Sequence, residues 1–421
     1  MSRRPHIVIS LGDPCGIGPE LLLGSLPAIQ VWADVTVVGC KAGVELLQGL
    51  PGALVTWRWT EPSTQRPRPV SGQAYALQVM AAGDPSGQVL GEALWLDPTP
   101  EIGTDQLKLG EGSAASGRAT VEAIRVAALM TMRGEADALV TLPMAKSAAH
   151  LAGYDIPGHT EFLQDLAGAP ITRMAFVSPR LNVVLHTVHQ SLRSVVETLN
   201  TDAVAETLAF SADQFIQLTG KLDLRVALCA LNPHAGENGA FGEEELLLDD
   251  AIVQAEAAFL DFSRAHEGAF STSPSPFRAD PSPTKQRAIA HESLPHYPSV
   301  GQRGLEVLST GSPSEPRRAP LFFGPLPSDS VFQRASRGEF DLVVALYHDQ
   351  GLIPIKLLEP DRAVNLTLGL PFIRTSPDHG TAFDKAGQWI AHSQNFLEAV
   401  SLAVRLTGRG LGSLQPPQPQ A

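Results

Sequence analysis

The segment FDLVVALYHDQGLIPIK, residues 340–356, carries the strongest indication of the fold. Residues 341–346 form a Val-rich apolar run, which is typical of a buried strand. The run ends abruptly at Tyr347, His348 and Asp349. Because open α/β sheets bind ligands at the carboxyl ends of their strands, this boundary predicts a functional site in an α/β protein.

More polar side chains follow within a short span, namely Lys356, Asn365, Arg374, Asp378 and His379. Any one of them alone is most simply a surface loop residue. The whole set lies between apolar runs and Gly-containing turns, and this pattern indicates a functional site.

Composition narrows the class of protein. The chain has 421 residues, 43% of them hydrophobic and 18% charged, and its length suggests about two to three domains. A formal net charge of −13 disfavours nucleic acid as a partner but leaves room for a small anionic substrate.

No apolar window reaches the length of about 20 residues that a membrane span requires, and the amino-terminal apolar run is too short for a signal peptide. Three widely spaced cysteines argue against a disulfide framework or a cysteine zinc site. We therefore expect a cytoplasmic protein that does not bind membranes.

Periodicity predicts further regular elements. Apolar runs typical of strands occur at residues 6–10, 35–39, 136–141, 182–187 and 224–231. Amphipathic patterns predict helices at residues 114–133 and 202–220.

Other segments are irregular in composition. Residues 52–90 are rich in Pro, Gly, Ser and Gln, and we expect loops with short strands there. Residues 263–320 lack periodicity and indicate a flexible insertion or an irregular lobe. The Gln-Pro tail after residue 411 is expected to be disordered.

The first expected strand runs into LGDPCGIGPE, residues 11–20. Its glycines allow either an anion cradle of backbone amides or a plain tight turn, and spacing alone does not separate the two. The GxGxxG spacing of a dinucleotide fingerprint is absent.

Three histidines share one context: His189, His234 and His348 each follow an apolar run and begin a polar turn. Crossover connections can bring the carboxyl ends of parallel strands together. Three imidazoles with an open coordination position are what a catalytic divalent metal requires. From the residues alone, separate hydrogen-bonded loop histidines remain the simpler interpretation. Asp349 either orients a neighbouring imidazole or caps a helix.

Another polar cluster follows residues 136–141. Lys146 comes first, and the turn PGHTE then places His159, Thr160 and Glu161 beyond the same strand. This cluster weakly favours a functional site.

Long mixed motifs show a family resemblance. LGDPCGIGPE, PGHTEFL, LNPHAGENGAFGEEE, FGPLPSDSVF and YHDQGLIPIK through VNLTLGLPFIRTSPDHGTA resemble the 4-hydroxythreonine-4-phosphate dehydrogenase family of PdxA type. They occur in the family's order and span nearly the whole chain.

The resemblance implies an α/β fold with two α/β/α domains and an interdomain active-site cleft, an architecture related to isocitrate and isopropylmalate dehydrogenases. We expect residues 1–140 and about 366–421 in the first domain and residues 141–365 in the second. The resemblance also implies a homodimer in which the partner subunit completes each site.

The family's site residues map onto this chain motif by motif. They imply metal binding by His189, His234 and His348, with catalytic roles for these three and Lys356. They imply substrate binding by a set of polar side chains: His159, Thr160, Lys356, Asn365 and Arg374. Candidates for cofactor binding are Asp378, His379 and Gly380.

The implied reaction is the NAD(P)-dependent, metal-dependent oxidation of 4-phosphooxy-L-threonine, a small phosphorylated hydroxy-amino acid. The product would decarboxylate to 3-amino-2-oxopropyl phosphate in pyridoxal 5′-phosphate biosynthesis. The sequence does not choose between NAD and NADP, or among zinc, magnesium, cobalt and manganese for the one divalent metal per subunit. Alternatives are the same chemistry on another phosphorylated hydroxy acid or a dihydrodiol carboxylate, and a three-histidine metal hydrolase.

Two segments depart from the family pattern. Residues 186–192 read HTVHQSL, where the family more often has Thr-Thr-His-x-Pro-Leu. Residues 263–320 have no counterpart in the compact family chain, and we expect a surface excursion that leaves the chemistry unchanged.

Overall fold

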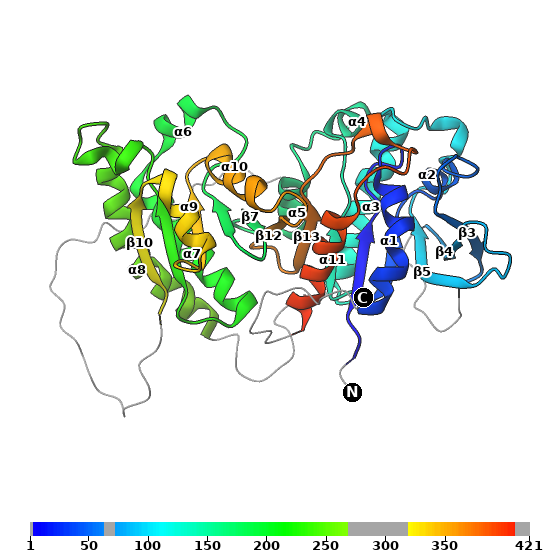
Figure 1. Ribbon diagram of the computed structural model, residues 1–421, viewed down its shortest axis with the longest axis horizontal. Helices are drawn as coiled ribbons and strands as arrows, with labels where there is room; N and C mark the ends of the chain where they lie inside the picture. The colour runs from blue at the N-terminus through cyan, green and yellow to red at the C-terminus, as the bar shows by residue number, and fades with distance from the viewer. Residues whose placement is uncertain (1–2, 63–71, 268–318, 409–421) are drawn as a thin grey trace, which may run out of the picture.

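The computed structural model describes residues 3–62, 72–267 and 319–408 (Figure 1). Their strands form one thirteen-stranded sheet in the order β10-β9-β11-β8-β7-β12-β13-β6-β1-β2-β5-β4-β3. Figure 1 shows β7, β12 and β13 between two larger groups of elements. The mixed α/β architecture agrees with the expectation from the sequence. The sheet passes through both expected domains, whose boundaries stay predictions.

One half of the sheet comes from both ends of the chain: β1 (His6–Ser10), β2 (Asp34–Val38), β3 (Val55–Thr60), β4 (Gln73–Ala81), β5 (Val89–Asp97), β6 (Ala138–Thr141) and β13 (Ile373–Pro377). The other half comes from the middle: β7 (Arg173–Val177), β8 (Asn182–Leu185), β9 (Arg225–Cys229), β10 (Leu321–Leu326), β11 (Leu342–Ala345) and β12 (Val364–Leu368). β13 runs parallel to β6, whereas β12 is antiparallel to both β13 and β7.

The described helices are α1 (Gly18–Trp32), α2 (Lys41–Glu45), α3 (Ala114–Met132), α4 (Lys146–Leu151), α5 (His159–Ala167), α6 (Leu192–Thr198), α7 (Thr201–Thr219), α8 (Glu244–Glu267), α9 (Ser328–Ser336), α10 (His348–Leu358) and α11 (Gln394–Thr407). Short 3₁₀ turns occur at η1 (Thr104–Gln106), η2 (Pro233–Glu237) and η3 (Phe383–Lys385). Within the described residues, no helix combines the length and apolar character needed to cross a membrane.

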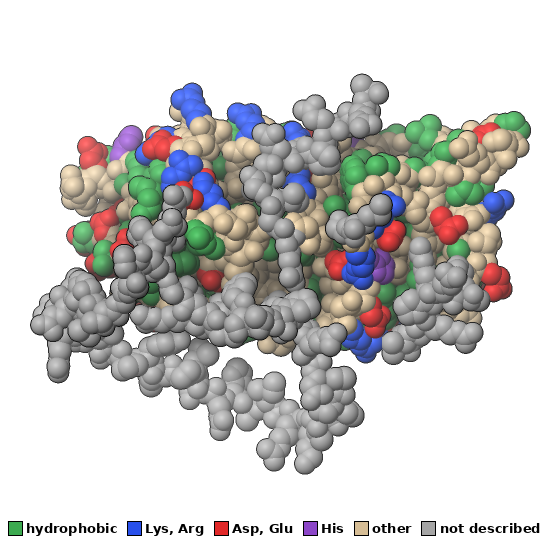
Figure 2. All heavy atoms as spheres, turned by 90° about the horizontal axis from the view of Figure 1, so that it is seen from below, with side chains coloured by type: hydrophobic (Ala, Val, Ile, Leu, Met, Phe, Trp, Pro, Cys, Tyr) green, Lys and Arg blue, Asp and Glu red, His purple; other side chains and the backbone are tan. Residues whose placement is uncertain are grey.

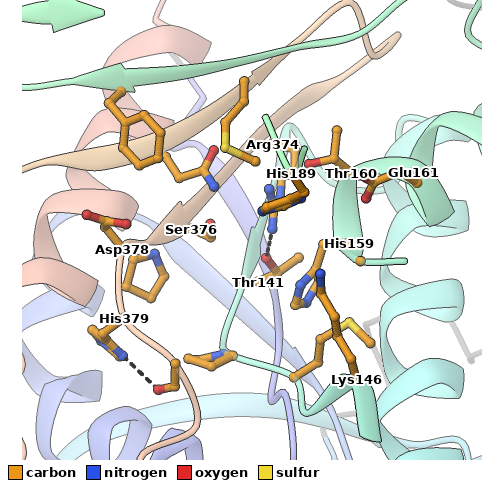
Figure 3. A pocket seen from close by; sticks show the side chains of 18 of the residues that line it. Thr141, Lys146, His159, Thr160, Glu161, His189, Arg374, Ser376, Asp378 and His379 are labelled. Atoms are coloured by element: carbon orange, nitrogen blue, oxygen red, sulfur yellow. Dashed lines mark hydrogen bonds between the residues drawn. The ribbon is translucent and has the colours of Figure 1, made fainter. Parts of the chain in front are cut away.

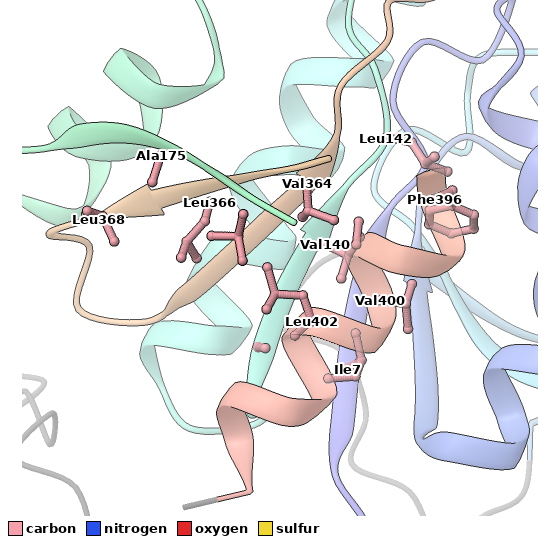
Figure 4. Close-up of a cluster of buried hydrophobic side chains, with 14 of the residues drawn as sticks. Ile7, Val140, Leu142, Ala175, Val364, Leu366, Leu368, Phe396, Val400 and Leu402 are labelled. Atoms are coloured by element: carbon pink, nitrogen blue, oxygen red, sulfur yellow. The ribbon is translucent and has the colours of Figure 1, made fainter. Parts of the chain in front are cut away.

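Part of the largest cluster of buried hydrophobic residues lies where α11 covers the middle of the sheet (Figure 4). Phe396, Val400 and Leu402 of α11 are fully buried with Val140 of β6 and Ile7 of β1. Strands covered on both faces read as continuous apolar runs, which explains why β1 and β6 were recognisable from the sequence. A Phe396→Ala change in such a packed position costs about 3–5 kcal/mol of folding free energy.

On the face shown in Figure 2, Lys and Arg side chains are scattered among Asp, Glu and uncharged side chains where described atoms are visible. That visible part of the surface shows no broad basic area.

Most expected elements are confirmed within one or two residues, including β1, β2, β6, β8, β9, β11, α3 and α7. Residues 52–62 and 72–90 are more regular than expected, because β3, β4 and the start of β5 form an antiparallel edge there, while residues 63–71 lie outside the described residues. The expected polar turn after residue 347 is wrong: His348 begins α10, and Asp349 lies in its first turn.

The expected insertion lies mostly outside the described residues. α8 continues to Glu267, so residues 263–267 are helical rather than irregular. Residues 268–318 and 409–421 are not among those described.

Candidate active site

The carboxyl ends of three neighbouring strands meet at one edge of the sheet. β11 pairs in parallel with both β8 and β9. The chain carries His189 after β8, His348 after β11 and His234 after β9. The expectation that the three histidines follow strands ending at a common edge is confirmed.

Two of the histidines lie together. The ring centroids of His189 and His348 are 6.1 Å apart, and the ring planes are inclined by 36°. Nδ1 of His348 is 2.7 Å from Oδ1 of Asp349, which leaves Nε2 free for a ligand. Burial, and then the charge of Lys146, lower the pKa of His189, so its ring is neutral near pH 7.

His234 lies apart from this pair. It is exposed, it does not line the cavity described below, and it belongs to a left-handed turn packed against α8 through Glu245. In residues 3–62, 72–267 and 319–408 of one chain, no group of three or more His, Cys, Asp or Glu side chains is arranged to hold a metal. The three imidazoles therefore do not meet within one chain, and metal binding by His189, His234 and His348 stays a prediction.

A cavity of about 340 Å³ opens beside His189 and His348 (Figure 3). Its lining contains the expected residues His159, Thr160, Asn365, Arg374, Asp378, His379 and Gly380. Of the expected site residues, only His234 and Lys356 are outside the lining. The polar residues that the sequence singled out thus come from distant segments into one concave site.

Register explains one wall of the cavity. Across the antiparallel strands β7, β12 and β13, Phe176 pairs with Asn365 and Asn365 with Ser376. Met174 likewise pairs with Thr367, and Thr367 with Arg374. Residues two apart on a strand share a face, so these two rows project from the same side of the sheet.

Arg374 is the charged centre of that wall. Its side chain is 2% exposed, with Nη1 3.0 Å from Thr367 Oγ1 and Nη2 2.6 Å from Thr141 Oγ1. Its Nε has no partner, and no carboxylate of the described residues forms an ion pair with it. Burial lowers the pKa of Arg374 to about 10, and Glu161 opposes that shift, so the guanidinium stays charged.

Other buried polar atoms of the lining also lack partners. They include Nε2 of His159, Oδ1 of Asn365 and Nε2 of His379. Burial, followed by the charge of Arg374, holds the pKa of His159 well below its ordinary value. Buried polar groups are normally hydrogen-bonded, so this set indicates a polar ligand.

The loop after β13 borders the cavity on the opposite side. Asp378 Oδ2 lies 3.1 Å from Lys356 Nζ, which joins this loop to α10. Burial raises the pKa of Asp378 against the opposing charge of Lys356. Nδ1 of His379 is 3.2 Å from the carbonyl of Gly380, and burial lowers the pKa of that ring.

Several lining residues were not assigned to the site from the sequence. Met144, Met174 and Phe176 supply apolar surface, and Thr141 and Ser376 supply polar groups. Recognising a strand at β7 would have placed Met174 and Phe176 on one face. Which face of β7 borders the cavity depends on its pairing with β12. No local sequence pattern predicts that pairing.

The amino-terminal loop, residues 11–20, does not line the cavity. A Cβ on Gly12, whose φ is +73°, would lie 2.3 Å from the carbonyl oxygen of Pro143. A Cβ on Gly18 would lie 2.3 Å from the carbonyl of Leu11. Close backbone approach therefore accounts for these glycines, as the tight-turn interpretation requires.

The family model described as "Pyridoxal phosphate biosynthetic protein PdxA" matches residues 69–271 and 315–403. The chain belongs to the PdxA family.

Individual PdxA relatives cover nearly the whole chain. The 4-hydroxythreonine-4-phosphate dehydrogenase of Desulfosudis oleivorans is 33% identical over 96% of this chain and 96% of its own length. The D-threonate 4-phosphate dehydrogenase of Salmonella typhimurium is 32% identical over 95% of this chain and 98% of its own. The crystal structure of 4-hydroxythreonine-4-phosphate dehydrogenase from Klebsiella pneumoniae, 29% identical, matches with a TM-score of 0.65 over 96% of this chain and 99% of that one. The chain is accordingly an oxidoreductase with the PdxA fold.

Proposed function

We propose that this PdxA protein oxidises the C3 hydroxyl of 4-phosphooxy-L-threonine with NAD+ or NADP+, in pyridoxal 5′-phosphate biosynthesis in the cytoplasm. C3 loses a hydride to the nicotinamide, and the hydroxyl loses its proton. The product is a β-keto acid, and breaking its C1–C2 bond releases CO2 and gives 3-amino-2-oxopropyl phosphate. The observation that carries the proposal is the buried Arg374 guanidinium, which faces the cavity without a carboxylate partner.

Anion binding follows from the side chains around Arg374. A buried cation without a counter-ion is costly unless a ligand supplies the negative charge. A guanidinium suits the phosphate or carboxylate of the substrate, because two of its N–H groups can bind two oxygens at once. Lys146 in the lining and Lys356 at the rim add positive charge, and Asn365, His159 and Thr160 offer neutral hydrogen bonds.

The donor set also fits a divalent cation. His189 and His348 present two imidazoles side by side, and Asp349 contacts the ring nitrogen of His348 that faces away from a ligand at Nε2. A bound zinc, magnesium, cobalt or manganese ion would act as a Lewis acid toward the substrate hydroxyl. The neutral His189 ring is able to donate its lone pair without first losing a proton.

The third imidazole is proposed to come from a second copy of the chain. His234 is exposed and outside its own cavity, so it is able to reach a neighbouring subunit. The proposed assembly is a homodimer in which His189 and His348 of one subunit and His234 of the other complete each site.

Mixing two inactive variants tests this assembly. His189→Ala and His234→Ala chains are purified separately, mixed under subunit exchange and assayed. A shared site restores activity, because one site of each heterodimer then has all three histidines. If His189, His348 and His234 act within one chain, every site lacks a ligand and the mixture stays inactive.

Asp378, His379 and Gly380 are proposed to bind the nicotinamide cofactor. His379 offers the unpartnered Nε2 as an acceptor, and Asp378 offers a carboxylate for hydroxyl groups. NAD+ and NADP+ both remain candidates.

D-threonate 4-phosphate is a second candidate substrate. It is favoured because relatives that align over nearly the whole chain are named D-threonate 4-phosphate dehydrogenase. It differs from 4-phosphooxy-L-threonine by a hydroxyl in place of the C2 ammonium, so the same groups would act. Formation of reduced cofactor and CO2 is measured for both compounds, with NAD+ and NADP+, before and after chelation. Faster turnover of 4-phosphooxy-L-threonine supports the first proposal, and turnover of neither compound contradicts both.

A further inference from the structure

We infer that Glu245 is a positioning residue for His234: it holds the left-handed turn that presents this imidazole at the edge of the sheet. The inference rests on the proposed metal role of His234. It concerns α8, which the proposed chemistry does not otherwise use.

The turn is conformationally unusual. His234, Ala235, Glu237 and Asn238 have φ values of 53°, 54°, 44° and 56°, and Gly236 between them has a φ of 73°. Side chains other than glycine disfavour this region, because the Cβ approaches the following carbonyl oxygen. Such a run persists only when contacts around it hold the backbone in place.

Glu245 supplies those contacts at the start of the turn. Its Oε1 accepts hydrogen bonds from the amides of Leu231, at 3.0 Å, and Asn232, at 2.7 Å. Its Oε2 accepts one from Asn232 Nδ2 at 2.8 Å. The residue is 6% exposed, so water does not readily replace these bonds.

Glu245 also fits closely beneath the turn itself. A Cβ on Gly236 would lie 2.8 Å from Glu245 Oε2 and 3.1 Å from the carbonyl oxygen of Gly242. The carboxylate therefore binds the residues before His234 and leaves no room for a side chain at residue 236. An acidic side chain in a first helical turn is usually explained by the helix dipole, but that effect does not require burial or bonds to a preceding loop.

Glu244 is a matched control on the same helical turn. Among the described residues its side chain accepts a hydrogen bond only from Asn232 Nδ2, at 2.7 Å, and it is less buried than Glu245. A Gln at residue 244 still offers a carbonyl oxygen to that donor. A Gln at residue 245 places its own NH2 group opposite Asn232 Nδ2, because its single oxygen stays with the two amides.

The test compares full-length wild type with Glu245→Gln, Glu244→Gln and His234→Ala. Zn2+ affinity is measured by competition with a chromophoric chelator, and the geometry of the site by the absorption spectrum of bound Co2+. We expect Glu245→Gln to weaken Zn2+ binding at least about tenfold, the scale found when a group supporting a metal ligand is removed. We expect Glu244→Gln to match wild type.

Hydrogen exchange at the amides of Leu231 and Asn232 gives a readout independent of metal and of activity. Exchange at both should be faster in Glu245→Gln than in Glu244→Gln. A purely structural role would lower the melting temperature of Glu245→Gln while its Zn2+ affinity and Co2+ spectrum stayed those of wild type, and this result overturns the inference. Glu245→Ala removes all three hydrogen bonds, so it serves as a second variant with a larger expected loss.

His234→Ala distinguishes the positioning role of Glu245 from the metal role of His234. If it weakens Zn2+ binding and Glu245→Gln does not, only the positioning role fails. If His234→Ala retains wild-type Zn2+ affinity, the metal role of His234 in the proposed function fails, and the inference fails with it.

Discussion

Lys356 Nζ lies 3.1 Å from Asp378 Oδ2, so an ion pair joins α10 to the loop after β13 at the rim of the cavity. Asp378 is buried at 16% side-chain exposure, whereas Lys356 is half exposed. The pair thus couples a residue proposed to bind the substrate to one proposed to bind the cofactor.

We expect Asp378→Asn to lower the KM for the substrate and to raise the KM for the nicotinamide cofactor. Lys356 must leave Asp378 to contact the substrate anion, and a half-exposed pair is worth up to about 1 kcal/mol, or about fivefold in affinity. Steady-state kinetics with each ligand varied separately measure both effects. If both KM values rise, the ion pair does not compete with the substrate.

Arg374→Gln should reduce kcat/KM for the substrate by about 100-fold, because a charge-assisted hydrogen bond contributes about 1.5–3 kcal/mol. The melting temperature should stay level or rise, since the change removes a buried cation that lacks a counter-ion. Arg362→Gln is the matched control, as Arg362 pairs with Glu398 and does not line the cavity. Unchanged substrate saturation in Arg374→Gln would contradict its assignment.

His348→Ala should abolish metal retention and turnover while leaving the fold intact. Asp349→Asn should weaken metal binding by about 10-fold, because its contact with His348 Nδ1 orients the ring. Metal content after gel filtration and circular dichroism measure these outcomes, with the exposed His392→Ala as control. Normal formation of reduced cofactor by His348→Ala after chelation would exclude the metal-centred mechanism.

Two buried groups should change stability with pH in opposite directions. Burial lowers the pKa of His186 to about 4, so the unfolded chain binds more protons between about pH 4 and 6.5 and stability rises with pH there. Burial raises the pKa of Asp13 to about 6, so the folded chain binds more protons between about pH 4 and 6 and stability falls with pH there.

Relative to wild type, His186→Gln should therefore flatten the rise of stability between pH 4 and 6, and Asp13→Asn should steepen it. Urea unfolding at several pH values measures the slopes. The same change of slope in both variants would contradict the assignment.

Local sequence patterns were sufficient to predict much of the fold and most of the polar residues of the site. The apolar runs that became β8, β9 and β11 are buried, and burial on both faces leaves a continuous apolar signal. A polar residue directly after such a run marks the carboxyl end of a strand. The family motifs added a substrate-binding role for Asn365 and Arg374, without revealing what surrounds them.

Strand pairing decided which apolar residues line the cavity. The antiparallel register of β12 with β7 and β13 set Met174 and Phe176 on the face that carries Asn365 and Arg374. Since the pairing of β12 with β7 joins residues nearly 200 positions apart, no local pattern specifies it.

The sequence by itself determined that histidines follow three buried strands and that a basic, polar pocket accompanies them. Only the tertiary structure placed His189 beside His348 and held His234 in a left-handed turn away from both. The physical reason is that the position of a side chain after a strand depends on the conformation of its loop. For His234 that conformation is fixed by Glu245, through contacts that form only when α8 packs against the end of β9.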